Sequence, residues 1–367
     1  MSILLFAVIL AVLILAHEFG HFIVAKAFGI RVDEFGLGFP PKLWGKKFGE
    51  TEYTINAIPF GGFVRIFGEN PSEDPSSQKG NGRSFAHKPK LVQSAVLLAG
   101  VTFNILLAWI LLSAGLMAGM PASEDEASLR GVPLKDASLV ITSTMKDSPA
   151  EKSGLKAGDR ILGATSGNEI LEDTKTESFQ NFIAVHEKVP VVIQVKRGSE
   201  SLSLTTTPEK GVIGETARIG ISLDSVGTIR LPFFQAITAG GSLTYSYTKM
   251  TVLGIYELLK NAVIGKPDFS SVSGPVGIVG IVQDASTLGF AYLIMLTALI
   301  SINLAVVNVL PIPALDGGRL FFILIEVVKG SPLKPRAVNL ANMIGFAVLI
   351  GLIVVVTFHD IWKLLTG

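Results

Sequence analysis

ILLFAVILAVLILAHEFGH, residues 3–21, decides how this chain folds, because an unbroken apolar run leads directly into His17, Glu18 and His21. On a helix, two histidines four residues apart lie on one face about 6 Å apart, which suits the binding of one zinc ion, and Glu18 is placed to act on a water. Ionisable groups in an apolar span are costly and are rarely kept without a partner or a task. The stretch predicts a zinc site at the end of a membrane span; the alternative is a histidine pair satisfied by neighbouring side chains.

Composition places part of the chain in lipid. Of the 367 residues, 49% are hydrophobic and 17% are charged, which is too apolar for a purely soluble protein. The net charge of +1 and the lack of a basic stretch interleaved with aromatic residues exclude a nucleic-acid surface. Because the chain has no cysteine, disulfides are excluded and a metal site must use His, Asp or Glu.

Four segments are long and apolar enough to cross a bilayer as helices: residues 3–27, 92–119, 288–310 and 340–358. The N-terminus lacks a basic leader and a small-residue cleavage site, so we expect the first span to be retained. Residues 231–265 carry too many polar side chains for a lipid-facing span, and we expect an amphipathic helix at the membrane interface.

Lys and Arg are concentrated in the loop between the first two spans and in the loop between the last two. The positive-inside rule places both loops in the cytoplasm and both termini outside, together with residues 120–287. We therefore expect four parts: residues 1–120 and 286–367 as the two halves of a membrane catalytic core, 125–210 as a soluble α/β domain, and 211–285 as a connecting segment.

Residues 52–68 contain two strand-like runs, TEYTINAI and FVRIF, joined by Pro59-Phe60-Gly61-Gly62. One interpretation is an ordinary surface hairpin. Because the runs are apolar and follow the metal-bearing span, we expect instead a membrane-associated β-hairpin that enters the protein-lined interior, where non-helical backbone is tolerated. An edge strand there could pair with substrate.

Residues 125–210 are mixed polar and charged, with strand-like runs at 139–144 and 191–195. Within them, SPAEKSGLKAGDRIL at 148–162 resembles the helix, turn and strand signature of PDZ domains. This resemblance implies a peptide groove formed by Leu139, Val140 and Ile141, beside a carboxylate-binding loop near residues 137–140 that lacks the usual glycine. Another small domain type is the alternative.

Two helix histidines four residues apart, with a glutamate after the first, are the zinc-binding pattern of metallopeptidases. A zinc site of this kind needs a third protein ligand and an open position for water. The remaining histidines are poorly placed, in a charged loop, in the soluble domain and at the outer end of the last span: His87, His186 and His359. Asp316, in NVLPIPALDGGR at 308–319, closely follows the third span. Asp316 is therefore the candidate.

Topology checks this choice independently, because spans one and three both run from outside to inside. His17 lies roughly 21 Å into its span, so His17 and Asp316 both lie toward the cytoplasmic side. Pro311 and Pro313 would break the helix and let the carboxylate turn toward the metal. A further role of Asp316 as an N-cap of the following helix stays open.

These motifs together resemble the site-2 protease family of intramembrane zinc metalloproteases, in its bacterial RseP/RasP-like branch with a single PDZ domain. The resemblance rests on HEFGH, on Leu315-Asp316-Gly317 and on the inserted domain. Three further stretches agree with it: GVTFN at 100–104, GGFVRIFGE at 61–69 and SGPVG at 273–277.

The combined interpretation is a zinc metalloendopeptidase in which His17, His21 and Asp316 hold one Zn²⁺ and Glu18 is the catalytic base and acid. His₂Asp ligation also suits other divalent ions. The resemblance implies substrate contacts from two groups of residues: Asn303, Asn308 and Asn104, and Phe63, Val64, Arg65 and Ile66 of the hairpin. For the asparagines, interhelical hydrogen bonding is a comparably good interpretation.

The family's usual task is regulated intramembrane proteolysis, of anti-sigma factors or of remnant signal peptides. It implies transmembrane-segment substrates, a peptide ligand at the PDZ domain, contact with lipid, and a multi-pass protein of the bacterial plasma membrane. The PDZ domain is expected outside and the active site toward the cytoplasm. Two rivals are a catalytically inactive membrane-anchored PDZ scaffold and a zinc transporter, which would show repeated halves.

Overall fold

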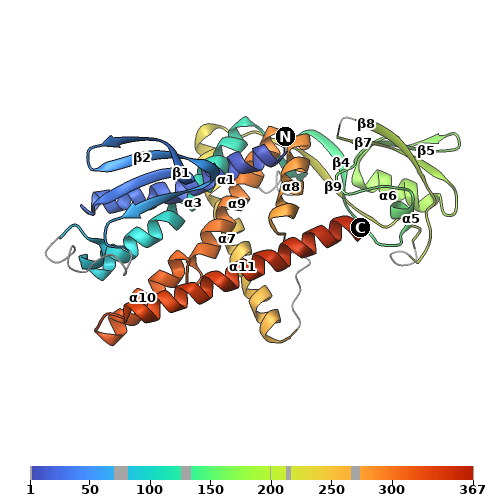
Figure 1. Ribbon diagram of the computed structural model, residues 1–367. Helices are drawn as coiled ribbons and strands as arrows, with labels where there is room; N and C mark the ends of the chain where they lie inside the picture. Colours follow the sequence, from blue (N-terminus) through green and yellow to red (C-terminus); the bar gives the residue numbers. More distant parts are fainter. Residues whose placement is uncertain are drawn as a thin grey trace. The chain divides into compact units, whose positions relative to one another are not determined.

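The computed structural model describes residues 2–69, 82–124, 134–198, 200–211, 216–265 and 273–366. The chain forms two compact units, one made of Met1–Ala114 and Ala236–Gly367 and the other of Gly115–Gln235. The first is mostly helical with a small sheet, and the second is built around a larger sheet (Figure 1).

Long helices dominate the first unit: α1 (Ser2–Ala27), α3 (Lys90–Ala118), α7 (Phe233–Val263), α8 (Pro275–Leu288), α9 (Phe290–Val309), α10 (Asp316–Lys329) and α11 (Pro335–Thr366). A short 3₁₀ helix, η1 (Phe85–His87), precedes α3. Four stretches are long and apolar enough to cross a membrane: Ile3–Ala27, Lys90–Ala118, Phe290–Val309 and Pro335–Trp362. They match the four predicted segments to within about five residues, by helix length and apolar composition. The fifth segment is a helix, α7, and its place at the membrane interface stays a prediction.

Helix α1, which carries His17 and His21, packs on α8 and α9 through an apolar cluster centred on Ile9, Leu13 and Val282. The N-terminus of α8 is held by α11, because the Asp360 carboxylate accepts the backbone N–H groups of Gly274 (3.2 Å) and Gly277 (2.8 Å). A carboxylate at a helix N-terminus satisfies N–H groups that have no partner within the helix. This contact accounts for the SGPVG stretch.

A small antiparallel sheet consists of β1 (Val32–Phe48) and β2 (Thr51–Ile66). The predicted hairpin at 52–68 is wrong in its pairing. Residues 34–37 of β1 pair with 52–55 of β2 on one side and with 62–65 on the other, so the two runs flank β1 and do not pair with each other. The run 62–66 is consequently an outer strand of this sheet.

The second unit has the strands β3 (Met120–Ser123), β4 (Lys135–Thr144), β5 (Arg160–Ser166), β6 (Glu169–Ile170), β7 (Val191–Arg197), β8 (Glu200–Thr206) and β9 (Ile221–Ile229), with helices α5 (Pro149–Lys152) and α6 (Thr176–Val185). Its strand order is β3-β9-β4-β5-β7-β8, with β6 on β5. The unit reaches beyond the expected 125–210, because β9 pairs with both β3 and β4.

Two features of the SPAEKSGLKAGDRIL stretch organise this unit. Ser148 caps α5, since its side chain accepts the N–H of Glu151 and Pro149 begins the helix. The fully buried Asp159 is bound by Arg197 through two contacts of 2.6 and 2.7 Å, and it also accepts the N–H of Lys156. Burial of this carboxylate is therefore compensated by hydrogen bonds.

Candidate metal centre

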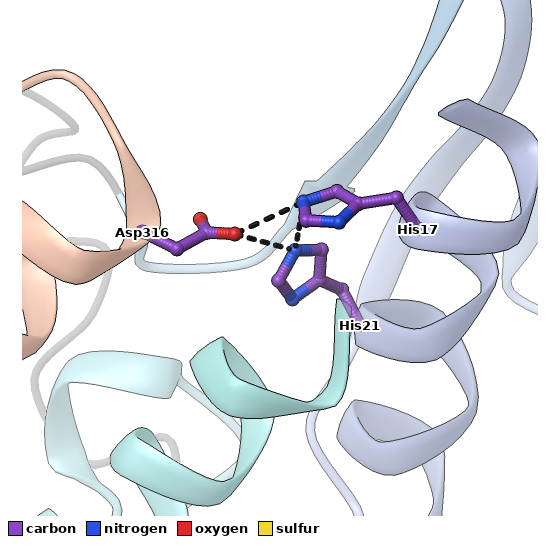
Figure 2. Close-up of side chains that lie close together, drawn as sticks. All are labelled: His17, His21 and Asp316. Carbon is purple, nitrogen blue, oxygen red and sulfur yellow. Dashed lines mark hydrogen bonds and ion pairs between the residues drawn. The ribbon is translucent and has the colours of Figure 1, made fainter. Parts of the chain in front are cut away.

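Three side chains from distant parts of the chain converge at one point (Figure 2). His17 and His21 lie one turn apart on α1, with their Nε2 atoms 3.2 Å from each other. Asp316 Oδ2, from the start of α10, lies 3.0 Å from His17 Nε2 and 3.2 Å from His21 Nε2. Two imidazole nitrogens and a carboxylate oxygen this close together can hold one divalent metal ion.

The other ring nitrogen of each histidine is already engaged. His21 Nδ1 lies 2.8 Å from the carbonyl oxygen of Val96, which fixes a proton on Nδ1 and leaves Nε2 as the metal-facing atom. His17 Nδ1 lies 3.3 Å from the side-chain amide of Asn104, which is fully buried. Both rings are thus oriented so that Nε2 points toward Asp316.

Asn104 Oδ1 is buried without a hydrogen-bond partner among the described residues. Rotating the amide by 180° brings Oδ1 to His17, where it accepts the Nδ1–H of a ring whose Nε2 is free for metal. That rotation satisfies the orphaned oxygen and fixes the tautomer that metal ligation requires. Asn104 thus contacts His17 from the side opposite Asp316, and this contact between α3 and α1 agrees with the interhelical alternative for Asn104 rather than with substrate contact.

Gly100 of α3 lies directly against the two imidazoles. A Cβ at this position would collide with the ring of His21 and would lie 2.8 Å from Cε1 of His17. Only glycine leaves room for both rings at this crossing of α1 and α3. This explains why GVTFN, with Gly100 and Asn104 one turn apart, belongs to the site.

Glu18 follows His17 on α1, and its carboxylate lies at the outer strand of the small sheet. Its Oε2 accepts the backbone N–H of Val64 at 3.1 Å. Residues Phe63, Val64, Arg65 and Ile66 all belong to that strand, β2, and Arg65 is further held by Glu34 at 3.0 Å. The structure thus places the predicted strand beside the predicted general base.

Asp316 is positioned by the turn at residues 311–315. Ala314 has a left-handed φ of 79°, and its N–H donates to Asn342 Oδ1 of α11 at 3.1 Å. The helix begins at Asp316, its N-cap is Leu315, and no side chain caps it. The alternative role of Asp316 as an N-cap is therefore wrong, and its carboxylate is directed at the histidines instead.

Two ion pairs hold α10 in place. Arg319 pairs with Glu69, the residue that follows the GGFVRIFG segment, and Glu326 pairs with Lys90 at the start of α3 at 2.5 Å. Gly317 permits a close approach, because a Cβ there would collide with the carbonyl oxygens of Val309 and Leu310. Asp316 is consequently fixed relative to both α3 and the small sheet.

The remaining predicted substrate residues lie on α9. Asn308 and Asp316 line the same small pocket, together with Val101 and other apolar residues. Asn303 is exposed, and its Oδ1 accepts the hydroxyl of Thr251 on α7 at 3.0 Å. Asn308 is thus adjacent to the metal-binding group, whereas Asn303 is bound to α7 one and a half turns away.

The predicted peptide groove at Leu139, Val140 and Ile141 is contradicted. Leu139 and Ile141 are buried in the core, and β4 is hydrogen-bonded on both sides, by β5 and β9, so it has no free edge for a peptide. A groove lies instead between α6 and the start of β9, lined by Phe179, Gln180, Ile183, Arg218, Ile219, Gly220, Ile221 and Leu223. The stretch Arg218-Ile-Gly-Ile221, with a glycine beside a basic residue, was the signal that could have found it.

Comparison with known proteins decides the family. The sequence profile described as peptidase family M50 matches residues 5–352 of this chain. The chain belongs to peptidase family M50. This is the site-2 protease family, so the chain is a zinc metalloprotease, and zinc is its cofactor.

Relatives within the M50 family span nearly the whole chain. The zinc metalloprotease RasP of Geobacillus kaustophilus is 31% identical, over 99% of this chain and 98% of the relative. RasP of Shouchella clausii is 29% identical, over 99% of both chains. A Clostridium perfringens protein, whose name provisionally describes it as a zinc metalloprotease, is 34% identical over 95% of both.

The solved structures that match this M50 protein include a PDZ domain. It is the PDZ domain of an SdrC-like protein from Listeria monocytogenes, which is 25% identical and covers 25% of this chain and 93% of its own, with a TM-score of 0.21.

Proposed function

We propose that His17, His21 and Asp316 are the zinc ligands of this M50 protease, that Glu18 is its general base and acid, and that it hydrolyses peptide bonds inside transmembrane segments. The observation that carries the proposal is the convergence of Asp316 Oδ2 with the Nε2 atoms of both histidines, within 3.2 Å across 299 residues of chain. The buried Oδ1 of Asn104, which has no hydrogen-bond partner among the described residues, also supports the proposal. After rotation of the amide it accepts the Nδ1–H of His17, and the Nε2 of that ring is then free to bind metal.

The chain's own groups supply positioning and proton transfer. Zinc, when bound, acts as a Lewis acid that polarises the scissile carbonyl and makes water more acidic. Glu18 takes the proton of the attacking water on a carboxylate oxygen and later delivers it to the leaving amine nitrogen. Val96 and Asn104 hold the two imidazoles in the neutral, Nδ1-protonated form throughout.

The outer strand at 62–66 supports binding of an unwound substrate. A substrate helix must open before a peptide bond can reach the metal, and in lipid its backbone groups then need new partners. A strand whose outward N–H at Val64 already meets the Glu18 carboxylate can offer such partners next to the site of chemistry. Asn308, which shares a pocket with Asp316, is placed to contact the same substrate segment.

We propose further that the unit Gly115–Gln235 is a PDZ domain that lies outside the cytoplasmic membrane and binds peptides in the groove between α6 and β9. The groove has one partly buried cation, Arg218, whose Nε has no partner among the described residues. The Lys- and Arg-rich loops support the expected sidedness, with the metal centre toward the cytoplasm.

The test uses purified full-length protein, a model single-span substrate and the Glu18→Gln variant. We expect the variant to keep one zinc ion per chain and to lose cleavage, while Glu257→Gln on α7 keeps both. Intact substrate with the unaltered protein would favour the scaffold or the transporter. Normal turnover by Glu18→Gln would overturn the role of Glu18.

A further inference from the structure

A largely apolar, partly open cavity of about 400 Å³ lies between α3, α7 and α9. Val101 and Ile105 of α3, Val252 and Ile255 of α7, and Ala305 and Val309 of α9 line it. The size is in the range of sites that bind small ligands or large side chains. None of the roles assigned above uses this cavity.

Two of the residues that line the cavity, Thr248 and Tyr256, carry a hydroxyl group. Thr248 lines it, but its hydroxyl donates to the carbonyl oxygen of Thr244 in the same helix at 2.7 Å. The methyl group of Thr248 is then the part left to face the cavity. A space of this kind favours hydrocarbon over any polar group.

The cavity adjoins a small pocket that contains Asp316, one of the candidate metal ligands. Val101 and Val309 line both the cavity and the small pocket that contains Asn308 and Asp316. Outside the cavity lining, the hydrogen bond from Thr251 to Asn303 joins α7 to α9. From Asn303 to Val309 the helix rises about 9 Å, which matches two to three residues of extended chain.

We propose that this cavity is a specificity subsite, which takes one large apolar side chain, such as that of leucine or phenylalanine, from the substrate's transmembrane segment next to the scissile bond. The inference rests on the proposed function and adds a preference to it. A substrate side chain is the occupant because Val101 and Val309 line both the cavity and the pocket of Asp316, beside which the cut peptide bond has to lie. A bulky residue gains from burial in the cavity, whereas alanine leaves it unfilled.

Cross-linking tests occupancy without turnover. Because the chain has no cysteine, Val252→Cys and Leu253→Cys each introduce a unique thiol, in a Glu18→Gln background that holds uncut substrate. The two positions are adjacent and equally exposed, 49% and 50%, but Leu253 does not line the cavity. Substrates with one cysteine near the cut should cross-link to residue 252 and not to residue 253. Equal cross-linking at both, or none at 252, would overturn the subsite.

Selectivity gives the second arm. For substrates that differ only by Phe or Ala at the cross-linked position, Val252→Trp should lower the Phe-to-Ala ratio of kcat/KM about tenfold or more, because it fills the cavity. Leu253→Trp should leave that ratio as in the unaltered protein. An unchanged ratio in Val252→Trp would contradict the proposal. Activity that depends on lipid chain length equally for both substrates would also contradict it and would indicate that a lipid occupies the cavity. If the unaltered protein cuts no transmembrane segment, the proposed function fails, while cross-linking still reports on the cavity.

Discussion

The side-chain amide of Asn104 lies 3.3 Å from Nδ1 of His17, on the opposite side of the ring from Asp316. A buried residue on α3 thereby sets the direction in which a ligand on α1 points. The same arrangement recurs at His21, where the carbonyl oxygen of Val96 plays this part at 2.8 Å. The metal centre is thus built by three helices, although its candidate ligands come from only two.

Replacement of Asn104 by alanine should loosen His17 and lower zinc affinity by roughly 10- to 100-fold, as loss of an outer hydrogen-bond partner of a ligand does. Competition with a chelator of known affinity measures this. Thr102→Ala, on the exposed side of α3, is the control and should bind zinc normally. Unchanged zinc affinity in Asn104→Ala would show that the amide does not orient the ring.

Replacement of Gly100 by alanine should displace the imidazoles and abolish stoichiometric zinc binding, because the new Cβ occupies the place of the His21 ring. Gly351→Ala is a matched control in a second apolar helix, since a Cβ there meets nothing within 4 Å. Zinc content by elemental analysis, with thermal unfolding in detergent to exclude a general loss of fold, separates the two variants. Full zinc content in Gly100→Ala would contradict the close packing of α1 on α3.

The Glu69–Arg319 ion pair should position Asp316, since Arg319 lies one turn after it on α10. Glu69→Arg and Arg319→Glu should each lower kcat/KM by about 100-fold, the loss expected for a small displacement of a reacting group. The double variant restores the opposite charges and should recover a substantial part of that loss. Lys42→Glu, in the exposed pair with Glu52, should have little effect. Losses that simply add in the double variant would argue against a direct pair.

Much of the first unit follows from sequence because it depends on local pattern. Apolar length predicted the four spans, and the four-residue spacing placed His17 and His21 on one face. Asp316 could be predicted as the third ligand because the charge of the loops fixes the direction of each span, which places Asp316 and His17 toward the same side of the membrane. Its convergence with the histidines is a long-range fact that only the structure shows.

Other features depend on partners far away in sequence, which local pattern does not reveal. The runs 52–58 and 63–67 looked like one hairpin, but residues 34–37, which contain Gly36 and are followed by Gly38, lie between them. Residues 221–229 lie outside the expected 125–210, yet they form β9, a central strand of the second unit. The sequence left the role of Asn104 open between two interpretations, because an asparagine in an apolar span is equally suited to substrate or to a neighbouring helix.

The zinc affinity of Asp316→Ala tests the central claim most directly. With Asp33→Ala as a control at a surface carboxylate, chelator competition should show affinity reduced by more than about 100-fold for Asp316→Ala, since the loss of an outer partner alone costs 10- to 100-fold. Asp33→Ala should bind one zinc ion like the unaltered protein. An Asp316→Ala variant that binds one zinc ion with undiminished affinity would contradict the three-ligand centre.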